Sequence, residues 1–117
     1  MSVTRQIPPE QATSYFDAFT RRFLLDLTPE SADVEVLHPD LGDQFEAEAV
    51  RVIGVTYDRK ENSLEVALQT GDHRTYHPKE MWVVEEPDGF VSTIEVVRPD
   101  DTRELVSLRH VGLRPLD

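Results

Sequence analysis

The chain has 117 residues, which is enough for one domain with a single hydrophobic core and too few for a second core. Its 23 acidic and 12 basic residues give a formal net charge of -11, which disfavours binding to nucleic-acid phosphates and to anionic membranes. Because the sequence contains no cysteine, disulfides, thiolate metal ligands and a cysteine nucleophile are all excluded.

The first predicted element is an amphipathic helix over residues 9–27. Its apolar residues recur at steps of three and four, and they are Ala12, Phe16, Phe19, Phe23 and Leu27. Pro8 and Pro9 stand where the start of a helix tolerates proline, and Pro29 ends the helix because its ring disfavours helical geometry at Thr28. We expect the apolar stripe to pack against a sheet.

Between residues 33 and 109 the apolar period changes to two, which predicts five or six antiparallel strands in meander order. The longest strand is predicted over residues 45–57, where strict alternation fails near Val50 and Arg51. A bulge or bend there restores the phase, and Gly54 offers a second flexible point. The segment from Met81 to Val84 lacks polar alternation, which predicts a strand covered on both faces.

These elements predict an α+β, mainly β fold in a single domain over residues 1–117, with a loose tail at 112–117. The N-terminal helix packs on a bent antiparallel meander. The long bent strand favours a small Sm-like or SH3-like barrel or half-barrel over an open bent sheet with the helix across one face.

Few residues show the spacing that chemistry requires. His73 and His77 lie four apart, but on a strand that separation is roughly 13 Å, too far for one metal ion. The glycines form no phosphate-binding loop, and the serines lack the glycines of a nucleophile elbow. We therefore predict no catalytic residue, no metal ligand and no cofactor.

The candidate ligand-binding residues are Arg74, Tyr76 and Trp82, which together could form a small amphipathic recognition patch. The alternative interpretation places Trp82 in the core and Tyr76 at its rim.

Several short elements along the chain match one family. They are Ile7-Pro8 before the aromatic helix, Gly42 and Gln44 before Ala47 and Ala49, Ile53-Gly54-Val55 in the long strand, His73 five residues before Pro78 and eight before Met81, Ile94-Glu95, and Leu105 after an acidic turn. On these residues the chain resembles a family of small, acidic, uncharacterised bacterial proteins known only as a domain of unknown function. Where its members often have Asp-Gly in the last turn, this chain has Asp100-Asp101. The resemblance implies a bacterial cytoplasmic domain, and it implies no activity or site residue.

The function that these observations favour is a non-enzymatic cytoplasmic binding or accessory domain. No window approaches the ~18 consecutive apolar residues of a membrane helix, and no secretory signal stands in the first residues. The expected partner is another protein or a second copy of the chain, since an unpaired sheet edge is a ready docking site for either.

Two alternatives remain open, although we lean away from an enzyme. The first is a small-molecule or metal-dependent enzyme whose site assembles from separated histidines, aspartates and glutamates, with His38, His73, His77 and His110 as the histidine candidates. The second is an Sm-like RNA binder, which the order of elements suggests and the charge of -11 disfavours.

Overall fold

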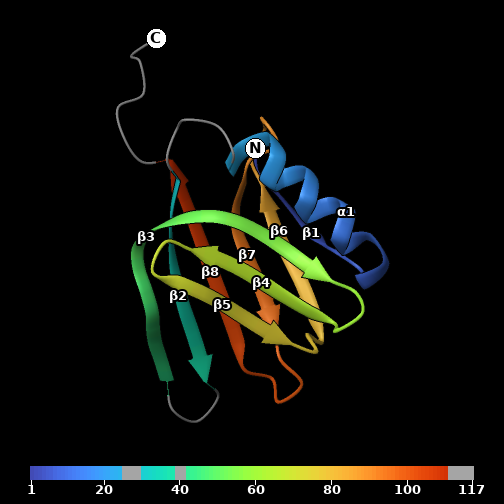
Figure 1. The fold of residues 1–117 in the computed structure, drawn as a ribbon, viewed down its shortest axis with the longest axis vertical. Coiled ribbons are helices and arrows are strands. Elements are labelled where there is room, and N and C mark those ends of the chain that lie inside the picture. Colours follow the sequence, from blue (N-terminus) through green and yellow to red (C-terminus); the bar gives the residue numbers. More distant parts are fainter. Residues whose placement is uncertain (25–29, 39–41, 111–117) are drawn as a thin grey trace.

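In the computed structural model, the described residues form an antiparallel sheet of eight strands with one helix packed against it (Figure 1). The structure describes residues 1–24, 30–38 and 42–110, except for the side chains at 30, 38, 43–47 and 110. The strands in chain order are β1 Val3–Gln6, β2 Glu30–His38, β3 Gly42–Asp58, β4 Ser63–Leu68, β5 Gly71–Tyr76, β6 Glu80–Glu85, β7 Val91–Val97 and β8 Arg103–His110.

The helix α1 spans Pro9–Phe19 and continues as a π-helical turn, η1, over Thr20–Leu24. It begins at the predicted residue, and Pro9 occupies the position where its missing N–H costs no helical hydrogen bond. The predicted apolar stripe is confirmed where it can be followed, because Ala12, Phe16 and Phe19 are buried. Leu27 and the predicted end of the helix lie outside the described residues.

The α+β, mainly β class is confirmed, but the prediction of five or six strands is wrong. β1 was missed because its four residues are all exposed, so they carry no apolar alternation. The meander order is also incomplete. The strand order is β1-β6-β7-β8-β2-β3-β4-β5, so β8 returns to pair with β2 and β6 pairs with β1 instead of β5. His77, at φ 54°, and Pro78 turn the chain away after β5.

The predicted bend in the long strand is confirmed. In the first half of β3 the register with β2 shifts between Ala32–Val50 and Val34–Ala47, and Ala49 adopts a φ of 51°. The Asp33 carboxylate accepts a hydrogen bond from the Ala49 N–H at 2.6 Å, which holds this bulge. A second register shift lies between Val52 and Gly54, where β3 pairs with β4.

Because of these bends, the sheet folds over itself into two layers. Figure 1 shows the second half of β3 with β4 and β5 crossing in front of β2, β8, β7 and β6. The sheet is not closed: among the described strands it ends at β1 and β5, so of the predicted barrel or half-barrel the structure has the half-barrel. α1 packs against β3, and its Tyr15 reaches β6 through the hydrogen bond to Glu85.

Two threonines fasten α1 and η1 to β3. The Thr13 hydroxyl donates to the Tyr57 carbonyl at 3.1 Å. The Thr20 hydroxyl donates to the Val55 carbonyl at 2.9 Å and accepts from the Val55 N–H at 3.0 Å. The core lies between the two layers and under α1, with the Phe16 side chain at 0% exposure near its centre. In the described part of the chain, no helix is both long and apolar enough to cross a membrane.

Candidate functional site

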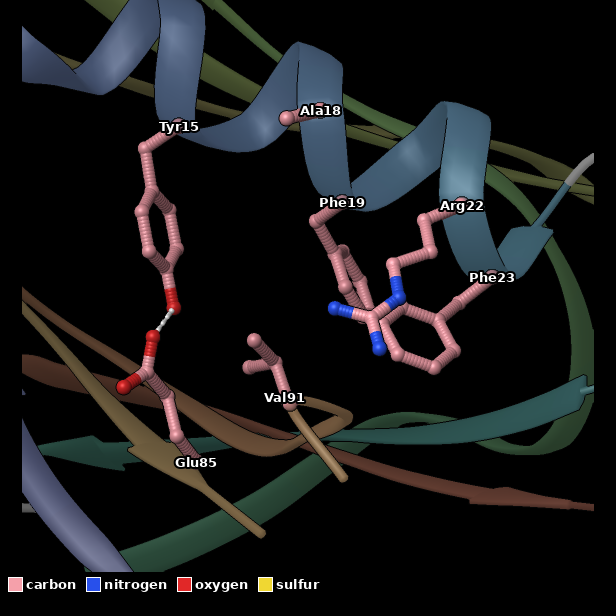
Figure 2. Close-up of a pocket in the computed structure, with 8 residues that line it drawn as sticks. Tyr15, Ala18, Phe19, Arg22, Phe23, Glu85 and Val91 are labelled. Carbon is pink, nitrogen blue, oxygen red and sulfur yellow. Dashed lines mark hydrogen bonds between the residues drawn. The ribbon is translucent and has the colours of Figure 1, made fainter. Parts of the chain in front are cut away.

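A cavity opens between the helical segment and the turn that joins β6 to β7 (Figure 2). Its volume is about 230 Å³. We call it the α1 pocket, and its lining consists of Tyr15, Ala18, Phe19, Arg22, Phe23, Glu85, Gly89 and Val91. Tyr15, Phe19 and Arg22 follow one another at helical steps, so one face of the helical segment forms one wall of the pocket. The continuation as a π-helix is a feature found frequently at functional sites.

The floor of the pocket is apolar and rigid. The Phe19 and Phe23 rings lie 5.5 Å apart between centroids, and both contact Phe90, at 5.9 Å and 5.4 Å. Val91 is buried at 1% exposure, whereas the Phe23 side chain is half-buried. Three mutually packed rings resist collapse, so the cavity is preformed.

One end of the pocket is closed by a hydrogen-bonded group. The Tyr15 hydroxyl donates to the Glu85 carboxylate at 2.5 Å, as Figure 2 shows. Arg5 forms an ion pair with the same carboxylate at 3.1 Å. Burial and the hydrogen bond to Glu85 raise the pKa of Tyr15. The phenol therefore stays protonated and remains the donor in its hydrogen bond to Glu85. The negative charge of Glu85 is thus already compensated.

The other end of the pocket carries Arg22. Its Nη2 donates to the Asp88 carbonyl at 2.8 Å, and its guanidinium carbon lies 4.8 Å from the centroid of the Phe23 ring. The guanidinium also rests on Gly89, where φ is +90° and a Cβ would stand 2.9 Å from Nη1. The turn of the β6–β7 hairpin therefore holds the cation in place. Among the described residues, Arg22 has no carboxylate within ion-pair distance.

A second polar cluster lies where β5 crosses β8. Glu104 is 1% exposed, and its carboxylate accepts hydrogen bonds from Thr75 Oγ1 at 2.7 Å, from Arg98 Nε at 2.5 Å and from His73 Nε2. Burial alone would raise the pKa of the Glu104 carboxyl, but these three hydrogen bonds outweigh it and lower the pKa to about 2. The cluster links the two layers of the half-barrel, and it is the part of the structure where a buried charge depends on partners from both layers.

The structure separates the three residues predicted to form a recognition patch. Arg74 and Tyr76 lie together on β5, with the guanidinium carbon 5.9 Å from the Tyr76 ring centroid and Arg74 Nη2 2.6 Å from Glu65. Both alternate with buried Thr75, so they face away from the interior.

Trp82 lies on the outer face of the other layer. It alternates with buried Met81 and Val83, and its indole N–H donates to Glu80 at 2.8 Å. This strand was predicted to be covered on both faces; its inner face is buried, whereas Trp82 and Val84 on the outer face are only partly buried. A second cavity of about 220 Å³ lies beside Trp82. The interpretation that places Trp82 in the core is wrong too.

The backbone positions of two of the four histidines are far apart. His38 pairs with Gly42 and His110 pairs with Glu30, so these two lie at opposite ends of β2, roughly 25 Å apart. His73 belongs to the Glu104 cluster, and His77 follows β5 in an exposed position. One metal ion cannot contact both His38 and His110. Among the described residues, no three histidine, aspartate or glutamate side chains are grouped so that they could hold a metal.

The sequence contains a signal for Glu104, a buried residue that was not predicted. Glu104 alternates in phase with Val106 and Leu108, which are buried, so the period of two marks it as an inward-facing acid. Nothing local marks Tyr15 and Arg22 as pocket residues, because their partners Glu85 and Asp88 lie 70 and 66 positions away.

The fold and the pocket together define a small α+β protein in which an open half-barrel and its helix form an open cavity with an aromatic floor and an arginine at one end. The chain belongs to a family of unknown function, DUF5335, whose model matches residues 3–115. It is also similar to an uncharacterised protein of Aquifex aeolicus (strain VF5), with 38% identity over 107 residues, which is 91% of this chain and 92% of the relative. The comparison with solved structures gave no match. The resemblance to an uncharacterised family is thereby confirmed.

Proposed function

We propose that the protein is a non-enzymatic binding or accessory domain that takes a small amphiphilic molecule into the α1 pocket. The observation that carries this proposal is a cavity whose floor is built from packed aromatic rings and whose two ends are closed by polar groups already held in position. An apolar body with a few well-placed polar groups at its margin is the usual design of a small-molecule site.

The size of the cavity limits the ligand. A volume of about 230 Å³ has room for about eight water-sized groups, because each takes about 30 Å³ in the liquid. The part of a ligand that enters the pocket is therefore smaller than a nucleotide or a typical drug. The lining contains no serine, cysteine or histidine, and its two other groups that could act as a base or nucleophile, Tyr15 and Glu85, are hydrogen-bonded to each other. Binding, rather than turnover, suits this lining best.

A fragment titration followed by NMR tests this function. Full-length protein labelled with ¹⁵N is titrated with a panel of compounds of about eight to twelve non-hydrogen atoms, with anionic, neutral and cationic head groups. We expect some of them to shift the amide signals of Phe19, Phe23 and Val91. The variant Ala18→Phe places a ring at the exposed rim of the pocket and should abolish these shifts. The control variant Gln11→Phe adds the same ring two turns earlier, outside the lining, and should bind as the unmodified protein does.

The proposal of a small-molecule function fails if no compound of the panel shifts the signals of the pocket, or if Ala18→Phe leaves the shifts intact.

We place the protein in the cytoplasm, a proposal supported by the absence of cysteine from all 117 residues, which fits a compartment without disulfides.

A second candidate function, self-association, is favoured by the open sheet. β1 is an end strand of the sheet order, and its four residues are all exposed. Its free edge could pair with β1 of a second copy. Sedimentation velocity over a hundredfold range of protein concentration tests this candidate, and a sedimentation coefficient of a monomer throughout would rule it out.

A further inference from the structure

We infer that the α1 pocket selects a small monocarboxylate: an anionic head group that pairs with Arg22, on an aromatic or branched aliphatic body that lies over Phe19, Phe23 and Val91. This inference rests on the proposed binding function and adds the chemical class of the ligand.

The first step is the charge at the pocket. The protein carries a net charge of -11, and six of the basic side chains in its described part are held by carboxylates; they are Arg5, Arg74, Lys79, Arg98, Arg103 and Arg109. Arg22 differs from these six. Among the described residues, the groups that hold it are a backbone carbonyl, an aromatic ring and a glycine, none of which carries a negative charge.

The second step is the geometry of the guanidinium. A guanidinium has five N–H donors in one plane, and the bond from Nη2 to the Asp88 carbonyl uses one of them. The remaining donors can bind a carboxylate in two parallel hydrogen bonds, which is the arrangement that arginine favours. Figure 2 shows the Arg22 guanidinium in front of the Phe23 ring, and Arg22 is an exposed residue of the lining, so a ligand in the pocket can reach it. The Phe23 ring, Gly89 and the Asp88 carbonyl all contact this exposed guanidinium.

The third step is the opposite end. A cationic ligand would require a carboxylate that has no cationic partner. The acidic group at this end, Glu85, already accepts a hydrogen bond from Tyr15 and forms an ion pair with Arg5. The single proton of the Tyr15 hydroxyl is used in that bond. This end therefore closes the apolar floor without attracting an ammonium group, and the pocket prefers an anion.

The nearby Asp88 does not reverse this preference. Its carboxylate accepts a hydrogen bond from the Phe90 N–H at 2.9 Å, within its own turn. The long-range repulsion of an anion by the acidic surface is screened at 0.15 M salt, where the Debye length is about 8 Å.

Three probes with the same apolar body test the inference: 3-phenylpropionate, 3-phenylpropan-1-ol and 3-phenylpropylamine. Each is titrated into the full-length ¹⁵N-labelled protein at pH 7 and 150 mM salt. For about ten contacting atoms in an open pocket we expect a Kd of about 0.1–1 mM for the carboxylate. The alcohol and the amine should bind at least tenfold more weakly. Arg22→Gln should remove this tenfold preference while the phenyl ring still shifts the Phe19 and Phe23 signals, and Arg22→Lys should restore part of it.

The matched control is Arg21→Gln, which removes the same charge from the neighbouring residue, exposed and outside the lining. It should keep the preference for the carboxylate. If the alcohol or the amine binds the pocket as tightly as the carboxylate, or if Arg21→Gln and Arg22→Gln have equal effects, the ligand class is wrong and the binding function stands. If compounds of the wider panel bind while none of the three probes does, the ligand class is again wrong. If neither the probes nor the panel shift the signals of the pocket, both proposals fail.

Discussion

The most informative perturbation of the fold is Glu104→Gln, because it removes the charge from the buried group that joins the two layers. In the native protein the pKa of Glu104 is lowered from 4.5 to about 2 by its hydrogen bonds to His73, Arg98 and Thr75, which outweigh the opposing effect of burial. A difference of that size between the unfolded and folded states corresponds to about 3 kcal/mol of stability at neutral pH.

The pH dependence follows from the direction of this shift. Because the folded-state pKa is depressed, the contribution is fully present above pH 4.5 and is lost as the pH falls from 4.5 towards 2. Glu104→Gln cannot titrate, so it should be about 3 kcal/mol less stable than the unmodified protein at pH 7. The difference in the free energy of unfolding between the variant and the unmodified protein should decrease as the pH falls from 4.5 and nearly vanish near pH 2.

Urea unfolding of both proteins at a series of pH values from 7 to 2.5 measures this difference. The other acidic groups titrate equally in the two proteins, so their effects cancel in the difference. The control is Glu95→Gln on β7, whose carboxylate pairs with Arg103 at 3.1 Å on the outer face and should contribute less than about 1 kcal/mol. A gap between Glu104→Gln and the unmodified protein that stays constant from pH 7 to 2.5 would refute the assigned role of the buried charge.

Three further changes test the packing of the helix and the bend of β3. Thr20→Val removes both hydrogen bonds to the Val55 backbone and should lower the free energy of unfolding by about 2 kcal/mol, measured by urea unfolding; a loss below 0.5 kcal/mol would show that these bonds do not fasten the helix. Ala49→Gly should leave stability unchanged or raise it by up to about 1 kcal/mol, because glycine adopts a φ of 51° without strain, and a clear fall in Tm would contradict this. Phe16→Ala leaves a cavity under the helix and should cost about 3–5 kcal/mol, and an unchanged midpoint of chemical unfolding would place Phe16 outside the core.

Features that depend on neighbouring residues could be predicted from the sequence. The start of α1 follows from two prolines and a periodic apolar stripe, both visible within one segment. The bend in β3 follows from the break in alternation near Val50, and the structure places its two bulges at Ala49 and between Val52 and Gly54. Each of these is a local conflict that the backbone must resolve in place.

Features that depend on distant pairing could not be predicted. The pairing of β8 with β2, which replaces a simple meander, joins residues that are more than sixty positions apart. The same limit explains the site: Phe19 and Phe23 belong to an apolar stripe that the sequence shows, but the polar ends of the pocket require β6 and the turn after it to lie beside the helix. The proposed patch of Arg74, Tyr76 and Trp82 was wrong in its geometry because closeness along the chain does not decide which outer face a strand presents.

The bent strand β3 has a consequence for how the molecule comes apart. Its first half is hydrogen-bonded to β2 and its second half to β4, so a single backbone belongs to both layers. If one layer unfolded, β3 would lose its conformation and the other layer would lose a strand. We therefore expect that neither layer stays folded alone. Amide protons in β2 and β4 should therefore exchange with deuterium through the same global unfolding, and the free energies of opening measured for the two strands should be equal.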